Sequence, residues 1–135
     1  MGYDIEIVGR CTDGQLDWEN SIFLGEADGE GWEELHQKVF MFTSFTEFIE
    51  QGGDRSNWDT FDNEQVKRSA DKFPLLTRLH DWYADALFLE NEIGSLYEEI
   101  ERAQTILPNN ALVTQLISAI KIATQRTACI SFIAD

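Results

Sequence analysis

Basic residues are scarce in this chain, which holds 10 Lys and Arg against 25 Asp and Glu in 135 residues, a formal net charge of −15. Affinity for a phosphate backbone comes from Lys and Arg, so the shortage argues against direct binding of nucleic acid. Residues 1–34 contain ten of the acids and a single base, Arg10. This local excess of negative charge favours long-range attraction of a positively charged partner.

Catalytic and metal-binding motifs are also missing. The two His and two Cys have neither zinc-ligand spacing nor a C-x-x-C motif, and no EF-hand loop, P-loop or nucleophile elbow is present. We therefore expect no metal, no cofactor and no enzymatic activity, with a hydrolase using an unrecognised carboxylate pair as a weak alternative. Cys11 and Cys129 are expected to be reduced and buried.

Long apolar runs are absent as well. No stretch approaches the roughly 20 apolar residues of a membrane-spanning helix, and the first residues lack the features of a secretion signal. We expect a cytoplasmic protein that does not contact membranes.

Aromatic residues, in contrast, are plentiful, with nine Phe and four Trp in a chain that is 43% hydrophobic. Disordered acidic chains are poor in aromatics, so this composition indicates an ordered protein. The length fits one domain over residues 1–135 with a sizeable core.

Two strands at the N-terminus are predicted to form a β-hairpin, and the alternative is a longer irregular loop across residues 10–20. Asp13-Gly14 suits a type I′ turn, and a turn there pairs five rungs on one face: Cys11 with Leu16, Gly9 with Trp18, Ile7 with Asn20, Ile5 with Ile22, and Tyr3 with Leu24.

Helical spacing dominates the middle of the chain. A first apolar stripe runs from Leu35 to Ile49 and ends at Gly52-Gly53, residues 54–63 read as a polar loop, and a short helix follows at 64–72. Apolar residues then recur in steps of three and four across 74–107, which predicts one long helix. Asn110 caps a further helix, and residues 128–133 read as a buried strand.

These elements predict an α+β fold, in which the N-terminal hairpin and the C-terminal strand form a small sheet packed against three to four helices. The wide apolar face of the 74–107 helix favours packing within one chain, so we expect a monomer or a weak dimer. A coiled-coil seam on the same helix is the alternative, and it would make the protein an oligomeric scaffold or subunit.

Two tryptophans, Trp32 and Trp58, stand among acidic residues, where an aromatic anchor surrounded by charge could bind a basic protein. The other interpretation is that each folds back onto the core. The predicted protein-binding residues are Asp13, Asp17, Glu19, Asp28, Glu30, Trp32, Glu33, Trp58 and Asp59.

An opening strand at residues 3–8, amphipathic helices and a closing strand at 130–135 together resemble the small cytoplasmic immunity proteins of bacterial polymorphic and contact-dependent toxin systems. The resemblance covers the architecture and includes no diagnostic motif. It implies an inhibitor that neutralises a cognate toxin domain, often a nuclease, by direct binding. The alternative within the same broad class is a phage-type nucleic-acid mimic that inhibits a defence nuclease.

Overall fold

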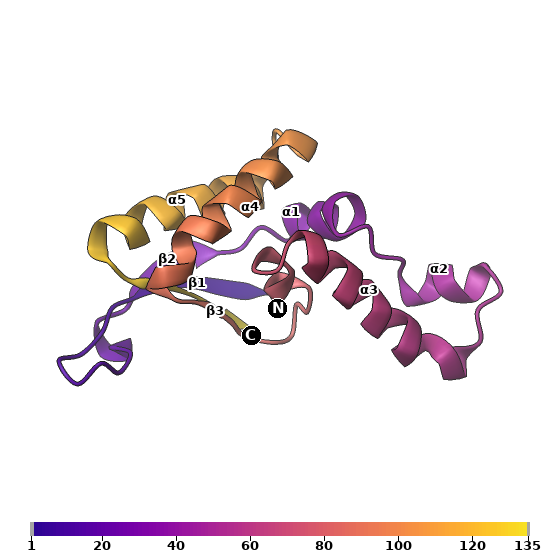
Figure 1. Ribbon diagram of the computed structural model, residues 1–135, viewed down its shortest axis with the longest axis horizontal. Coiled ribbons are helices and arrows are strands. Elements are labelled where there is room, and N and C mark those ends of the chain that lie inside the picture. Colours follow the sequence, from indigo (N-terminus) through magenta and orange to yellow (C-terminus); the bar gives the residue numbers. More distant parts are fainter. Residues whose placement is uncertain (1, 135) are drawn as a thin grey trace.

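A four-stranded antiparallel sheet organises the computed structural model, which describes residues 2–134 (Figure 1). Its strands are β1 (Tyr3–Val8), β2 (Ile22–Glu26), β3 (Ala86–Phe88) and β4 (Cys129–Ala134), in the order β2-β1-β4-β3. The closing strand therefore joins the N-terminal strands, and the predicted α+β class is confirmed. Asp135, which ended the closing strand in the resemblance, lies outside the described residues.

The register of the N-terminal strands differs from the prediction. Ile7 pairs with Ile22 and Ile5 with Gly25, while Arg10 and Leu16 form an isolated bridge beside the Asp13-Gly14 turn. The connection contains a 3₁₀ turn at Trp18–Asn20 (η1). This arrangement places Ile22 rather than Asn20 opposite Ile7, so two apolar side chains share the rung. Cys11 is exposed in this connection, contrary to expectation, whereas Cys129 is buried.

Two long helices cover one face of the sheet, α4 (Ile93–Ile106) and α5 (Ala111–Arg126), as Figure 1 shows. Asn110 caps α5 as predicted, accepting a 3.0 Å hydrogen bond from the Val113 amide. α5 contacts β1 and β4, α4 packs against α5, and Leu96, Ile100 and Leu116 are completely buried in the core between these elements. Alternation along β1 gives that strand one apolar side, because Tyr3, Ile5 and Ile7 are buried.

The single helix predicted over 74–107 does not form. The segment contains a 3₁₀ turn at Leu76–Leu79 (η4), strand β3, a second 3₁₀ turn at Glu90–Glu92 (η5), and only then α4. The buried Glu99 carboxylate accepts hydrogen bonds from the Leu75 and Leu76 amides, and the Asp81 carboxylate accepts one from the Tyr83 amide. Such side-chain acceptors stabilise turns in competition with a helix. The single 74–107 helix on which the scaffold alternative depends is therefore absent. The apolar side of α4, with Ile93, Leu96 and Ile100, is buried by contacts with other elements of the same chain.

The stripe from Leu35 to Ile49 is also divided, into α1 (Gly29–Glu34), a π-helical turn at Leu35–Val39 (η2) and α2 (Phe45–Glu50). Met41 has a left-handed backbone (φ 59°), which interrupts the helical segment. Ser44 caps the N-terminus of α2 by accepting a hydrogen bond from the Glu47 amide. The predicted polar loop at 54–63 is mostly helical, since α3 spans Trp58–Lys72 after a 3₁₀ turn at Arg55–Asn57 (η3). Figure 1 shows α2 and α3 extending away from the sheet.

No helix among residues 2–134 combines the length and apolar character that crossing a bilayer requires.

Candidate functional site

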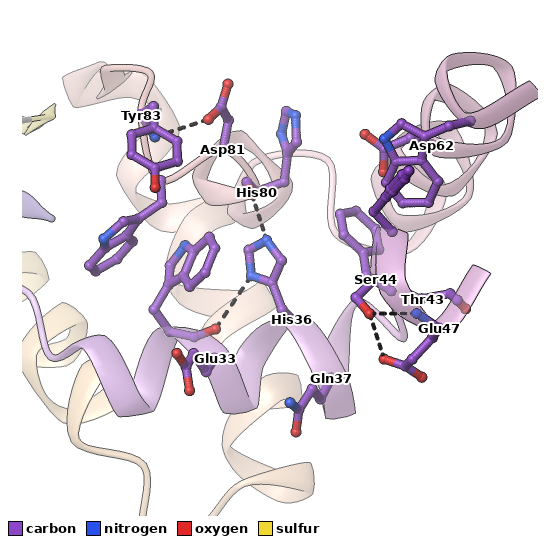
Figure 2. Close-up of a pocket in the computed structure, with 15 residues that line it drawn as sticks. Glu33, His36, Gln37, Thr43, Ser44, Glu47, Asp62, His80, Asp81 and Tyr83 are labelled. Atoms are coloured by element: carbon purple, nitrogen blue, oxygen red, sulfur yellow. Dashed lines mark hydrogen bonds between the residues drawn. The ribbon is translucent and has the colours of Figure 1, made fainter. Parts of the chain in front are cut away.

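A cleft of about 980 Å³ opens where α1, η2, α2, α3 and the turn at residues 80–83 meet (Figure 2). Six aromatic side chains line it: Trp32, Phe42, Phe45, Trp58, Trp82 and Tyr83. Two histidines, three neutral polar residues and four acids complete the lining: His36, His80, Gln37, Thr43, Ser44, Glu33, Glu47, Asp62 and Asp81. We call this feature the aromatic–acidic cleft.

Trp32 forms part of one wall and is held by its neighbours. Its indole Nε1 donates a 2.7 Å hydrogen bond to the Leu79 carbonyl, and its ring centroid lies 3.7 Å from that of His36 and 4.6 Å from that of Trp82. Gly31 brings α1 against α5, because a Cβ at Gly31 would stand 2.8 Å from the Leu112 amide nitrogen. The half-buried Trp32 is thus a fixed ring that presents an aromatic surface.

His36 links α1 to the turn at residues 80–83. Its Nε2 lies 2.5 Å from the His80 carbonyl oxygen and its Nδ1 lies 3.3 Å from the Trp32 carbonyl oxygen (Figure 2). Burial lowers the pKa of His36 below its ordinary value, which favours the neutral ring. A neutral ring carries one N–H, so His36 donates to only one of these carbonyls. Both ring nitrogens are nevertheless directed at backbone carbonyls of the chain, and His36 serves to position the wall.

The opposite wall comes from α2 and α3. Phe45 stacks on Trp58 with centroids 5.4 Å apart and planes at 21°, and Trp58 also contacts Phe48 and Phe61. The buried Gln65 side chain fixes the chain before α2: its Oε1 accepts from the Thr43 amide at 2.6 Å, and its Nε2 donates to the Thr43 carbonyl at 3.1 Å. This pair of hydrogen bonds determines where α2 begins relative to α3.

Negative charge predominates in the lining of the cleft, with Arg55 at its edge over the Phe45 ring. The lining contains four carboxylates and neither Lys nor Arg. Within residues 2–134 the ion pairs are Arg10–Glu90, Arg78–Glu92 and Lys38–Glu34, so none of the four cleft carboxylates takes part in one. A cationic ligand would therefore meet carboxylates that no basic side chain neutralises.

Three of the predicted binding residues, Trp32, Glu33 and Trp58, line this one cleft although they come from different helices. The exposed Glu30 and Asp59 lie on the same helices outside the lining. Asp28 caps α1, since its carboxylate accepts from the Gly31 amide at 2.7 Å.

The remaining predicted residues, Asp13, Asp17 and Glu19, lie in the connection between β1 and β2. Figure 1 shows this connection at the opposite end of the molecule from α2 and α3. Asp13 accepts a hydrogen bond from the Gln15 amide and Asp17 accepts one from Asn20, so both also shape the connection. The acidic segment 13–34 is thus divided between two ends of the fold.

Sequence reasoning missed most of the cleft, including Trp82 and the 68% exposed Tyr83. Both had been placed in the predicted 74–107 helix. The available signal is Asp81, because Asp side chains favour turns by accepting a hydrogen bond from the backbone two residues on. Asp62 lies on α3, in the segment that the sequence predicts to be a loop.

Across residues 2–134, no group of three or more His, Cys, Asp or Glu side chains is arranged to hold a metal ion. Comparison with protein-family models, curated proteins and solved structures gives no match to this chain, so what the cleft binds must follow from its own side chains.

Proposed function

We propose that this protein is an acidic binding protein that neutralises a basic protein partner, most specifically an immunity protein that inhibits a cognate toxin domain. One observation carries the proposal: a cleft lined by six aromatic side chains and four carboxylates, without Lys or Arg. Aromatic side chains in desolvated pockets supply most of the binding energy of protein interfaces, and surrounding charge speeds encounter.

Two further features support a protein partner over a small metabolite or a nucleic acid. The cleft is at the upper end of the roughly 300–1,000 Å³ typical of ligand sites, and it is open enough for a segment of a second chain. A net charge of −15 repels polyanions and attracts a basic surface, such as the groove of a nuclease.

The experiment is a growth-rescue assay in which this chain is co-expressed with candidate basic toxin domains, starting with any that the neighbouring genes encode. Co-expression should restore growth, the purified proteins should form a stable complex, and association should slow between about 20 mM and 150 mM salt, as screening shortens the reach of exposed charge to about 8 Å. Trp58→Ala should weaken the complex by roughly tenfold or more, the loss expected for an aromatic anchor. The exposed Tyr97→Ala on α4 is the control.

Failure to protect against any of these toxin domains would contradict the immunity function. Inhibition of a defence nuclease instead, in competition with its DNA substrate, would favour the nucleic-acid mimic. An association rate that does not depend on salt would refute electrostatic attraction in either version.

A further inference from the structure

The hydrogen-bonding groups of the aromatic–acidic cleft limit what it can bind. The Trp32 Nε1 is already bonded to the Leu79 carbonyl, both His36 nitrogens face carbonyls, and His80 Nδ1 lies 2.9 Å from the Thr77 carbonyl. These four ring nitrogens are therefore directed at carbonyls of the chain itself. Aromatic faces and carboxylate oxygens, which accept hydrogen bonds and attract positive charge, make up much of the remaining lining.

The carboxylates of the cleft come from different elements. Figure 2 shows Glu33 on α1, Asp62 on α3 and Asp81 on the turn at residues 80–83. Two of the four are partly engaged, because Ser44 Oγ donates to Glu47 Oε1 at 3.1 Å and the Tyr83 amide donates to Asp81 Oδ1 at 2.9 Å. A cationic group with several donors can bond to more than one of the remaining acceptors.

This chain already places guanidinium groups on its own aromatic rings. Arg55 lies over the ring of Phe45 at 5.9 Å, Arg78 over Phe88 at 5.5 Å and Arg102 over Phe73 at 4.7 Å. Phe45 lines the cleft, so the first of these pairs marks one edge of the site. Trp32, Trp58 and Trp82 carry no such cation in the described structure and offer larger faces.

We propose that the aromatic–acidic cleft receives an arginine side chain carried on an extended segment of the basic partner, an inference that rests on the proposed function. A guanidinium is planar, stacks on indole rings and presents five donors, and it sheds water more readily than an ammonium. Lysine offers a compact, strongly hydrated charge with three donors, which matches separated carboxylates and aromatic walls less well. The volume of about 980 Å³ exceeds what one side chain fills, so the residues flanking the arginine also enter the cleft.

The test uses three blocked pentapeptides, Gly-Gly-X-Gly-Gly with X as arginine, lysine or citrulline, titrated into the full chain and followed by NMR and tryptophan fluorescence. Citrulline keeps the shape of arginine without its charge. The arginine peptide should bind at least tenfold more tightly than either of the others, and its shifts should centre on the tryptophan indoles of the cleft. Glu33→Gln and Asp62→Asn should each weaken arginine binding at least threefold.

Matched controls are Glu101→Gln on α4 and Asp71→Asn on α3, exposed acids outside the cleft that remove the same charge. If these controls weaken binding as much as the cleft variants, the effect is diffuse electrostatics and the arginine site is refuted. Equal binding of the lysine or citrulline peptide would also refute it.

A fourth peptide, Lys₈, distinguishes this inference from the proposed function. If Lys₈ binds with strong salt dependence while the arginine peptide shows no preference, the arginine site fails and attraction of a basic partner stands. If neither cationic peptide binds at low salt, both proposals fail.

Discussion

The Gln65–Thr43 contact should control both stability and the shape of the cleft. Gln65 is 1% exposed and makes two hydrogen bonds to the backbone of Thr43, so Gln65→Ala removes both partners from a half-buried amide and carbonyl. Each hydrogen bond contributes about 0.5–1.5 kcal/mol net, so the two together contribute about 1–3 kcal/mol. The lost packing of the buried side chain adds about 1 kcal/mol at roughly 0.8 kcal/mol per methylene, partly offset by the β-carbon that remains.

A total near 2–4 kcal/mol corresponds to a fall in Tm of roughly 6–15 °C for a domain of this size. Urea and thermal unfolding by circular dichroism would measure the loss. Hydrogen exchange would locate it, since the Thr43 amide should lose protection while amides of β4 keep theirs relative to global stability. Gln104→Ala, an exposed glutamine on α4, is the matched control. If Gln65→Ala shifts Tm no more than Gln104→Ala and Thr43 stays protected, the argument for this contact is wrong.

Substitutions at three other residues test the core and two titratable groups. Leu96→Ala should cost about 2–5 kcal/mol in unfolding free energy, because Leu96 is fully buried under the sheet; unchanged Tm with altered oligomeric mass would contradict this. Burial raises the pKa of Glu99, so folding takes up a proton there, and this stabilisation is lost as pH rises above about 4.5 toward the folded pKa. The unfolding free energy of Glu99→Gln should therefore rise relative to that of the wild type across this pH range. Glu99→Ala should be less stable than the wild type at every pH, because the Leu75 and Leu76 amides lose their acceptor. Burial lowers the pKa of His36, so stability should fall as pH drops below the ordinary value of 6.5, and urea titrations should show a weaker fall between pH 7 and 5 in His36→Gln.

The parts of the fold that sequence could predict are those with one strong periodic signal. The alternating residues of β1 and the apolar run of β4 indicate strands, and Asn110 before an apolar stripe indicates the start of α5. These elements pair or pack as expected because nothing local competes with the pattern. The inner face of α4, with Ile93, Leu96 and Ile100, was recognised for the same reason.

Residues 74–92 were predicted wrongly because a three-four spacing of apolar residues is not unique to helices. Ala86 and Phe88 are both buried as alternate residues of β3, and Leu79 is buried at the end of a 3₁₀ turn. Their spacing matched a helix by coincidence. Residues 86–88 form a strand because they pair with the edge of β4 that β1 leaves unoccupied. The sequence of residues 86–88 alone does not reveal this long-range pairing.

For the candidate site, sequence identified two anchors, Trp32 and Trp58, but not their common location. Whether both face one cleft depends on where the chain turns between them, at Met41 and Ser44. The interpretation that each tryptophan folds back onto the core is partly right for Trp32, which packs on Trp82 and donates to Leu79 while lining the cleft. Trp58 instead belongs to a smaller aromatic cluster with Phe45, outside the main core.

The cleft is bordered by departures from regular structure. A π-helical turn follows α1 at Leu35–Val39, a left-handed residue at Met41 turns the chain toward α2, and an Asx turn at Asp81 displays Tyr83. π-Helical turns and left-handed non-glycine residues cost free energy and persist where the surrounding structure holds them, often at functional sites. Met41 is 64% exposed, so burial of its side chain does not explain its conformation. The non-helical residues 41–44 separate η2 from α2, and Phe45 of α2 and Trp32 of α1 both line the cleft. The π-helical turn, the left-handed Met41 and the Asx turn at Asp81, which the helical spacing of the sequence does not predict, therefore border the surface on which the proposed binding depends.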